Sequence, residues 1–178
     1  MTVFIALVRA VNVGGTSKLP MAELKEICVQ LGYENVQTYI ASGNVLFKSN
    51  ESAAKIRKAL EEAISKYLGK STTVFAKTLA EMKEILENNP FPAQPGNQVY
   101  AIFLENAFKG DILTDVLHEG DEEIVLGKKV IYVYYSEGMG KSKLVLPAAK
   151  SGTARNMNTV AKLVELGTEL TQTPTWVQ

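Results

Sequence analysis

The sequence predicts an α+β protein made of two tandem ferredoxin-like domains. The first observation is the order of residues 1–78, where apolar runs and helical periodicities alternate as β-α-β-β-α-β. The second is the segment 89–96, which contains three prolines and a glycine and is typical of a loop between domains. The third is the order of elements after residue 98, namely strand, short helix, hairpin and helix, which is similar to the order in half of a ferredoxin-like fold. We therefore expect domains at residues 1–78 and 79–178.

The first domain is expected to contain four strands, at residues 3–8, 36–40, 45–48 and 71–75. The first of them is a continuous apolar run, typical of a strand buried on both faces. Pro20 suits the first turn of a helix and Gly32 suits its end, while Ser49 or Asn50 is expected to cap a second helix. The apolar faces of these helices comprise Met21, Leu24, Ile27, Cys28 and Leu31 in the first and Ala53, Ile56, Leu60, Ile64 and Tyr67 in the second.

The second domain begins with a helix, because Thr78 and Glu81 have the spacing of a capping box. Strands are expected at residues 99–104, 123–126 and 130–135, with a hairpin turn at 127–129. Further helices are expected at 111–117, at 142–149 and after an N-cap at Asn156.

The overall charge argues against some classes of function. The chain has 19 basic and 19 acidic side chains, and this zero balance is not typical of a dedicated nucleic-acid or membrane-surface protein. The apolar run at the start ends at Arg9, which is too early for a membrane span, and it lacks the basic flank of a signal peptide. The single cysteine, Cys28, fits a reducing compartment, so we expect a cytoplasmic protein and leave its oligomeric state open.

The charges are distributed unevenly along the chain. Residues 1–78 hold ten basic and six acidic side chains, residues 79–123 hold two and ten, and residues 124–178 hold seven and three. The stretches 1–22 and 138–163 contain no acidic residue at all. We interpret the acid-free stretches as candidate anion-binding segments, and the acidic segment as a solvated face or a surface for a basic partner.

The loop after the first strand is the first candidate site. Gly14 and Gly15 lie between the end of a strand and the start of a helix, where backbone N–H groups can hold an anion. The alternative is a structural turn that needs positive φ angles. The loop matches neither a Walker A motif nor GxGxxG. Arg9 ends an apolar strand, where its guanidinium needs a carboxylate, a backbone group or a ligand as partner.

The segment 153–159 (TARNMNT) is the second candidate site. It places more polar side chains at a helix start than capping uses, and Arg155 offers a forked donor suited to carboxylate or phosphate. The complete set of residues expected to bind a ligand is Arg9, Asn12, Gly14, Gly15, Lys18, Ser42, Asn44, Arg155, Asn156 and Asn158.

Other reactive side chains fit structural roles. His118 stands among scattered acids, which is more typical of a solvated surface than of a metal site. Cys28 lies on the apolar face of a helix and is expected in the core. The sequence contains no catalytic triad, metal cluster or cofactor fingerprint, so we expect no metal and no cofactor, and we leave enzymatic activity open.

Four ordered motifs are spread over nearly the whole chain, namely LVRAVNVGG from Leu7, MAEL from Met21, TYIASGNV from Thr38 and TARNMNT from Thr153. Together they resemble the bacterial family known as domain of unknown function 1697. The resemblance implies two ferredoxin-like α+β domains in a soluble bacterial protein, and it implies no activity, cofactor or substrate. A histidine that is common in the family near Tyr135 or Ser136 is absent here, so no catalytic role is carried over.

These observations favour a binding protein whose two domains bring the acid-free stretches together around a small anionic or phosphorylated ligand. An alternative is a module that binds single-stranded nucleic acid, because Tyr132 and Tyr134 share one face of a strand. No RNP-type motif is present, and nucleic acid is the less favoured partner. An enzyme of unidentified chemistry, or polar clusters that only join the domains, are further alternatives.

Overall fold

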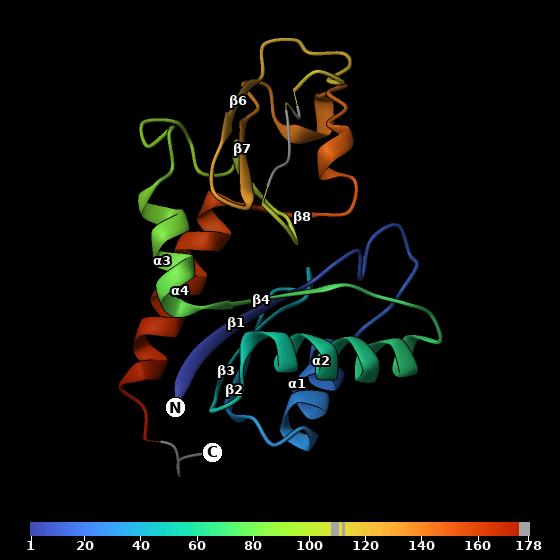
Figure 1. Cartoon of the computed structure of the whole chain (residues 1–178), viewed down its shortest axis with the longest axis vertical. Coiled ribbons are helices and arrows are strands. Elements are labelled where there is room, and N and C mark those ends of the chain that lie inside the picture. Colours follow the sequence, from blue (N-terminus) through green and yellow to red (C-terminus); the bar gives the residue numbers. More distant parts are fainter. Residues whose placement is uncertain (108–110, 112, 175–178) are drawn as a thin grey trace. The chain divides into compact units, whose positions relative to one another are not determined.

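The strand β1 (Thr2–Val8) lies in the middle of the first sheet, whose other strands are β2 (Glu34–Tyr39), β3 (Asn44–Ser49) and β4 (Val74–Thr78). The order is β2-β3-β1-β4, and every pairing is antiparallel. Residues 3–8 are all buried, which confirms the prediction of a strand covered on both faces. The computed structural model, drawn in Figure 1, describes residues 1–107, 111 and 113–174.

Tertiary contacts divide the chain into two units. The first unit comprises Met1–Lys83 and Leu163–Gln178, and the second comprises Glu84–Lys162. Each unit contains one four-stranded antiparallel sheet together with helical segments, so the protein is α+β as predicted. The expected second domain, 79–178, includes residues 79–83 and 163–178, which the contacts assign to the first unit. That residues 1–78 and 79–178 fold as independent domains stays a prediction.

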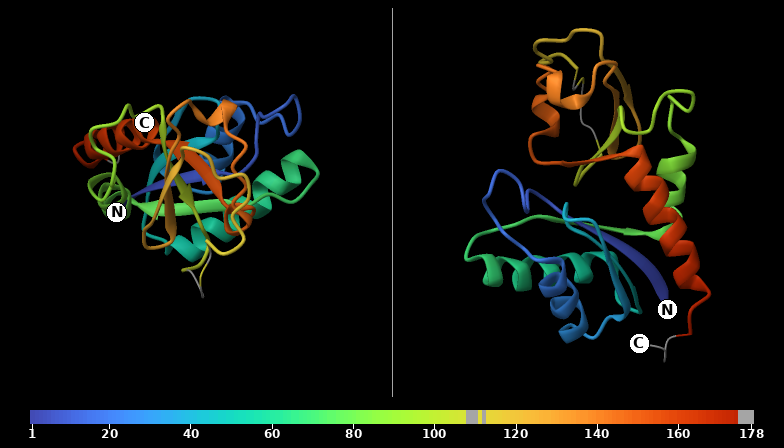
Figure 2. Two further views of the ribbon diagram at one scale, coloured as in Figure 1. Left: turned by 90° about the horizontal axis from the view of Figure 1, so that it is seen from above. Right: turned by 180° about the vertical axis from the view of Figure 1, so that it is seen from behind.

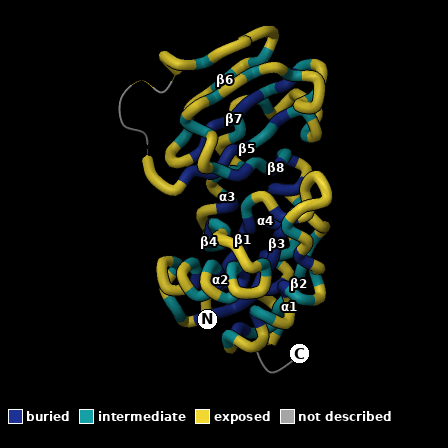
Figure 3. The backbone as a smooth tube through the Cα atoms, turned by 90° about the vertical axis from the view of Figure 1, so that its right-hand side faces the viewer, coloured by how far each residue is buried: buried dark blue, intermediate teal, exposed yellow. Residues whose placement is uncertain are grey.

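Two helices, α1 (Met21–Gln30) and α2 (Ala53–Leu68), cover one face of the first sheet (Figure 1 and Figure 2). Between helices and sheet lies the core of the unit, which includes Phe4, Ala6, Val8, Leu24, Cys28, Val45, Phe47, Ile56, Leu60 and Ile64. Figure 3 shows β1 and β3 as largely buried strands. Because each large apolar side chain contributes about 1.5–3 kcal/mol on burial, this layer holds the sheet and both helices in place.

The ends of these helices follow from local sequence. Gly32 adopts a φ of 86° directly after α1, and the next N–H, of Tyr33, donates to the carbonyl of Cys28 at 3.1 Å. This is the predicted glycine end of the helix. The prediction for the start of α2 was wrong, because its N-cap is Ser52 and not Ser49 or Asn50. The Ser52 hydroxyl accepts a hydrogen bond from the backbone N–H three residues later.

The second sheet is formed by β5 (Val99–Phe103), β6 (Glu123–Leu126), β7 (Val130–Tyr134) and β8 (Thr153–Asn156), in the order β6-β7-β5-β8. The first three strands and the hairpin at 127–129 were predicted. The strand β8 was not, because its residues were expected at the start of a helix. Thr153 and Arg155 are the buried positions of β8, and they pair with Phe103 and Ala101 of the central strand. Polar side chains therefore occupy the buried positions of β8, so a search for alternating apolar residues does not reveal this strand.

Two helix starts were predicted correctly. The helix α3 (Leu79–Glu87) begins with the capping box, in which Thr78 N–H donates to Glu81 Oε2 at 2.8 Å and Glu81 N–H donates to Thr78 Oγ1 at 3.2 Å. The helix α4 (Met157–Thr171) is capped by Asn156, whose Oδ1 accepts from Thr159 N–H at 2.9 Å. Of the helices in the described residues, none is long and apolar enough to cross a membrane.

The helix expected at 142–149 was wrong. Two short 3-10 turns, η1 (Met139–Lys141) and η2 (Pro147–Ala149), stand in this region instead. Pro147 lacks the N–H that a helix interior needs, and the Ser142 hydroxyl accepts a local hydrogen bond from Leu144 N–H at 3.1 Å. The helix expected at 111–117 includes Ile112, which lies outside the described residues, and residues 113–115 form a turn.

Candidate anion-binding site

The loop after β1 is held by the side chain of Asn12. Its Nδ2 donates to the carbonyls of Leu19 and Ala41, each at 2.8 Å, and its Oδ1 accepts from Leu19 N–H at 2.8 Å. Asn12 has a φ of 56°, a conformation that asparagine tolerates better than most residues. Two of these bonds join the ends of the loop to each other and the third joins the loop to the turn after β2, so Asn12 has a structural role.

The paired glycines form the tip of this loop. Gly14 and Gly15 have φ values of 61° and 74°, and Thr16 N–H donates to the carbonyl of Val13 at 3.2 Å across the turn. A Cβ atom at either glycine would meet nothing within 4 Å. This geometry is that of an exposed tight turn, and an anion at these amides stays a prediction. The neighbouring Lys18 is exposed.

The turn between β2 and β3 is also tied into the protein. Asn44 is fully buried, and its Nδ2 donates to Tyr39 O at 2.9 Å and to Ser42 Oγ at 2.8 Å. Gly43, with φ 87°, packs against the end of β1, where a Cβ atom would lie only 2.7 Å from Val11 Cγ2. The two predicted ligand residues of this turn, Ser42 and Asn44, therefore bond to each other.

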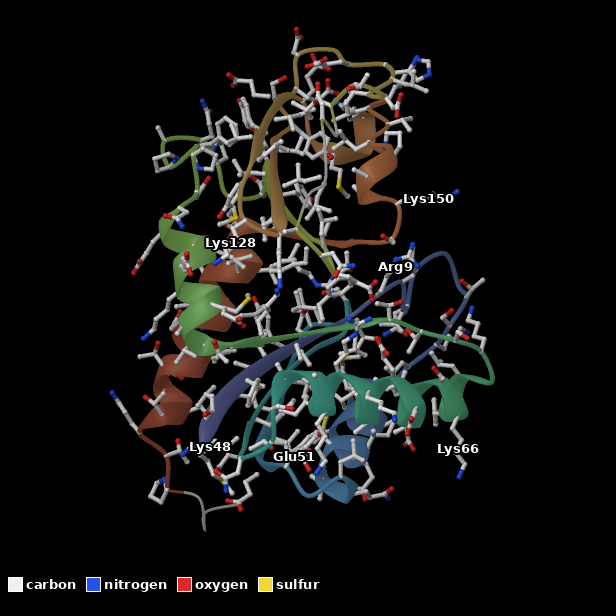
Figure 4. The ribbon with its side chains drawn as sticks, viewed as in Figure 1. Arg9, Lys48, Glu51, Lys66, Lys128 and Lys150 are labelled. Atoms are coloured by element: carbon white, nitrogen blue, oxygen red, sulfur yellow. The ribbon has the colours of Figure 1, made fainter. Side chains whose placement is uncertain are left out.

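A pocket of about 340 Å³ lies in the first unit, between the loop after β1 and the loop that joins α2 to β4. Two cationic side chains line it, Arg9 from the first loop and Lys70 from the second. Figure 4 labels Arg9 directly after β1. The remaining lining consists of four hydroxyl side chains and three apolar ones, namely Ser17, Ser71, Thr72, Thr73, Ala10, Val11 and Leu68.

The backbone of the second loop is fixed at both ends. Gly69 ends α2 with a φ of 72° and donates to Ser65 O at 2.9 Å, while the Ser65 hydroxyl accepts from Thr72 N–H at 3.1 Å. Because these residues bond as a loop, β4 starts at Val74, three residues later than the predicted strand. Val74 N–H in turn donates to Glu61 Oε1 at 3.1 Å.

The two loops are bonded to each other as well as to their own elements. Arg9 N–H donates to Thr73 O at 2.9 Å, and the Thr72 hydroxyl donates to Arg9 O at 3.4 Å. These contacts extend the antiparallel pairing of β1 with β4 beyond its last pair, Val8 with Val74. The fold therefore places an arginine and a lysine, 61 positions apart in the sequence, on the same pocket.

The chemistry of this lining suits an anion. None of the described residues that line the pocket is acidic. A guanidinium donates two parallel hydrogen bonds to an oxyanion, an ammonium adds a point charge, and hydroxyl groups donate to further oxygen atoms. Among the described lining residues the polar groups are the guanidinium, the ammonium and the four hydroxyl groups, all of which can donate hydrogen bonds to an anion.

Of the ten residues predicted to bind a ligand, Arg9 lines this pocket. The loop at residues 70–73 was missed by the sequence analysis. A usable signal was present, because the chain carries no acidic residue between Glu62 and Glu81 while it contains Lys66, Lys70 and Lys77. This third acid-free stretch is comparable to the two that were recognised.

The remaining predicted residues belong to the second unit. Arg155 is only 7% exposed, and its Nη1 donates to Thr153 Oγ1 at 2.8 Å and to Ala154 O at 2.9 Å. Burial lowers the pKa of Arg155 from its usual value to about 10. Asn156 caps α4, and Asn158 Oδ1 packs so closely over Gly96 that a Cβ atom there would lie 2.1 Å away. Each of the three has a structural contact within the unit.

Other candidates receive no support as reactive sites. In the described part of the chain, no three histidine, cysteine or acidic side chains gather as a metal site. Cys28 is buried, and desolvation raises the pKa of its thiol to about 12. Tyr132 is 3% exposed and donates to Ile85 O at 2.7 Å, while the ring of Tyr134 packs on Phe91. Tyr132 is therefore not exposed for stacking on a base, which the alternative of a nucleic-acid-binding module requires.

The strand order and the pocket define a mixed α+β protein with a basic, hydroxyl-lined cavity in its first unit. Comparison with protein families shows that the chain belongs to the family described as protein of unknown function (DUF1697), whose model matches residues 1–132. A solved structure, of the conserved bacterial protein SP0830 from Streptococcus pneumoniae, is 27% identical and has a TM-score of 0.75. The similarity covers 93% of this chain and 98% of that one. No curated protein matches the chain.

Proposed function

We propose that this protein binds a small anionic ligand in the pocket between residues 9–17 and 70–73, and that a phosphorylated molecule suits the site best. The observation that carries the proposal is the lining: Arg9 and Lys70 face a pocket that has four hydroxyl side chains and no acidic one. A phosphate group uses all of these donors, because it offers several oxygen atoms and up to two negative charges.

The size of the pocket narrows the ligand class. A volume of about 340 Å³ exceeds the needs of a phosphate ion and falls at the small end of ligand sites, which span roughly 300–1,000 Å³. The apolar part of the lining, from Ala10, Val11 and Leu68, suits a compact organic body attached to the phosphate. Sugar phosphates and similar small phosphorylated metabolites fit this description.

The finer fold is part of the same proposal. We infer that both units are ferredoxin-like, and what supports this is the order β2-β3-β1-β4 in one sheet and β6-β7-β5-β8 in the other. In both, the first strand of the unit lies between its third and fourth strands. Domains at residues 1–78 and 79–178, and a share of Arg155, Asn156 and Asn158 in ligand binding, stay predictions from the sequence.

The test is a thermal-shift titration of the purified protein with inorganic phosphate and a panel of sugar phosphates. A ligand that binds only the folded state raises the melting temperature in proportion to the logarithm of its concentration above Kd. We expect a shift for the wild type that is clearly smaller in Arg9→Ala and Lys70→Ala and kept in Lys66→Ala, whose side chain extends from α2 (Figure 4). Equal shifts in all four proteins would refute the site.

A further inference from the structure

The strand β6 lies at one end of the second sheet and pairs only with β7 among the described strands. At the hairpin, Gly127 N–H donates to Val130 O at 2.7 Å, so these two residues form a hydrogen-bonded pair. Along antiparallel strands, hydrogen-bonded pairs alternate with pairs that make no hydrogen bond to each other. Val125 and Glu123 therefore bond to β7. The N–H and C=O groups of Ile124 and Leu126 are directed to the open edge, where another strand can use them.

Apolar surface accompanies this open edge. Val125 is 39% exposed and Leu126 is 40% exposed, although both belong to a strand. Beside them lies a groove of about 360 Å³, whose apolar lining includes Phe91, Leu113 and Val116. An exposed edge with apolar side chains is a liability in a protein that stays monomeric, because it pairs readily with other chains. A natural partner that covers the edge removes this liability.

The charge at the groove indicates what kind of partner fits. Glu119, Glu122 and Glu123 line it, and no basic residue is among the described lining residues. The carboxylate of Glu122 accepts hydrogen bonds from Gly120 N–H at 2.7 Å and from the Ser142 hydroxyl, and these bonds lower its pKa. The groove therefore carries negative charge at neutral pH and attracts lysine and arginine side chains.

We propose that the open edge of β6 binds an extended, basic segment of a partner protein by strand addition. In this mode the backbone of the segment bonds to Ile124 and Leu126. Side chains two positions apart on the added strand lie on one face, so an apolar side chain beside Val125 is followed by a basic one beside Glu123. The partner is therefore expected to carry lysine or arginine two residues from an aliphatic side chain.

Two other occupants fit less well. A second copy of this chain that paired in parallel would bring Glu119, Glu122 and Glu123 of both copies together, and like charges oppose such pairing. An antiparallel dimer is the outcome that the sedimentation measurement below detects. A nucleic acid would meet the same repulsion from its phosphates. The charge complementarity thus selects a basic polypeptide, and it does so independently of the anion pocket in the first unit.

The probe for a test is a fluorescein-labelled peptide, Thr-Lys-Thr-Val-Thr-Lys, titrated with the whole protein at low ionic strength and followed by anisotropy. We expect saturable binding that weakens with added salt, and no binding of the matched peptide with glutamate in place of lysine. The double variant Glu119→Lys/Glu123→Lys should weaken binding by about tenfold or more. The double variant Glu26→Lys/Glu62→Lys, at exposed positions of α1 and α2, is the charge-matched control and should bind as the wild type does.

A backbone variant separates strand addition from simple charge attraction. Leu126→Pro removes an N–H that points to the open edge and leaves the ladder with β7 intact, so it should weaken peptide binding while Leu126→Thr preserves it. Circular dichroism verifies that each variant is folded. Unchanged binding in the charge-reversed protein, absence of peptide binding, or sedimentation as a dimer that Leu126→Pro dissociates would each overturn the proposal.

Discussion

The backbone N–H of Arg9 donates a 2.9 Å hydrogen bond to the carbonyl of Thr73 and so joins the two loops that line the basic pocket. Through this bond the backbone of Arg9 is held by the segment before β4 as well as by β1. The bond needs only the backbone, so side-chain substitutions at Arg9 leave it in place. Loss of the Arg9 side chain is therefore separable from loss of the bond between the two loops.

The first prediction uses that separation. Arg9→Ala and Lys70→Ala should each weaken phosphate-ligand binding by roughly tenfold, since each removes a charge-assisted hydrogen bond. The free energy of unfolding of Lys70→Ala, at an exposed position, should stay within the range of ordinary surface substitutions, about 0.5 kcal/mol, as measured by urea unfolding. A large loss of stability in either variant would show that the side chain is structural and not kept for a ligand.

The second prediction concerns Asn12, whose side-chain amide makes three hydrogen bonds inside the protein. Asn12→Ala should reduce the free energy of unfolding by about 1–3 kcal/mol, because the carbonyls of Leu19 and Ala41 and the N–H of Leu19 lose their partner. Equilibrium urea denaturation measures this directly. Lys18→Ala, at an exposed position of the same loop, is the control and should have almost no effect.

The third prediction compares two glycines with positive φ. Gly43→Ala places a Cβ atom 2.7 Å from Val11 Cγ2 and 3.1 Å from Val8 Cβ, whereas the same change at Gly15 meets no atom within 4 Å. Both variants carry the left-handed backbone strain of about 1–3 kcal/mol, and Gly43→Ala adds a steric clash. Thermal unfolding should therefore rank the wild type first, Gly15→Ala second and Gly43→Ala last. The reverse order of the two variants would contradict the packing of Gly43 against β1.

The fourth prediction is a loss of stability at alkaline pH. Burial raises the pKa of the Cys28 thiol from 9.0 to about 12. Burial is also the largest of the causes that raise the pKa of the Tyr33 hydroxyl from 10.0 to about 12. The folded state holds both protons more tightly than the unfolded state, so their contribution is fully present below pH 9.0 and is lost as the pH rises toward 12.

The check for this prediction is urea unfolding at a series of pH values from roughly 7 to 11. The free energy of unfolding should fall along the series, and Cys28→Ala should show a shallower fall because one of the groups with a raised pKa is gone. In parallel, a thiol reagent should modify the native protein far more slowly than the urea-unfolded one. A native thiol that reacts at the unfolded rate would contradict its burial.

The elements that the sequence predicted correctly are those with a local signal. The apolar run of β1, the glycine after α1 and the Thr78–Glu81 capping box depend on neighbours in the chain, and each is found as expected. The strand β8 was missed because it is short, polar and defined only by its pairing with β5. The pocket was predicted only in part for the same reason. Arg9 could be predicted from its place at the end of an apolar strand, whereas Lys70 comes close to it only through the pairing of β1 with β4.

The most direct test of the central claim is an NMR titration of isotope-labelled protein with inorganic phosphate and then with a sugar phosphate. Binding in the pocket should give saturable shifts concentrated in the amide signals of Arg9, Ser17 and residues 70–73, and Lys70→Ala should need roughly tenfold more ligand for the same shifts. Shifts confined to Gly14 and Gly15, or to residues 153–158, or no saturable shift at all, would contradict it.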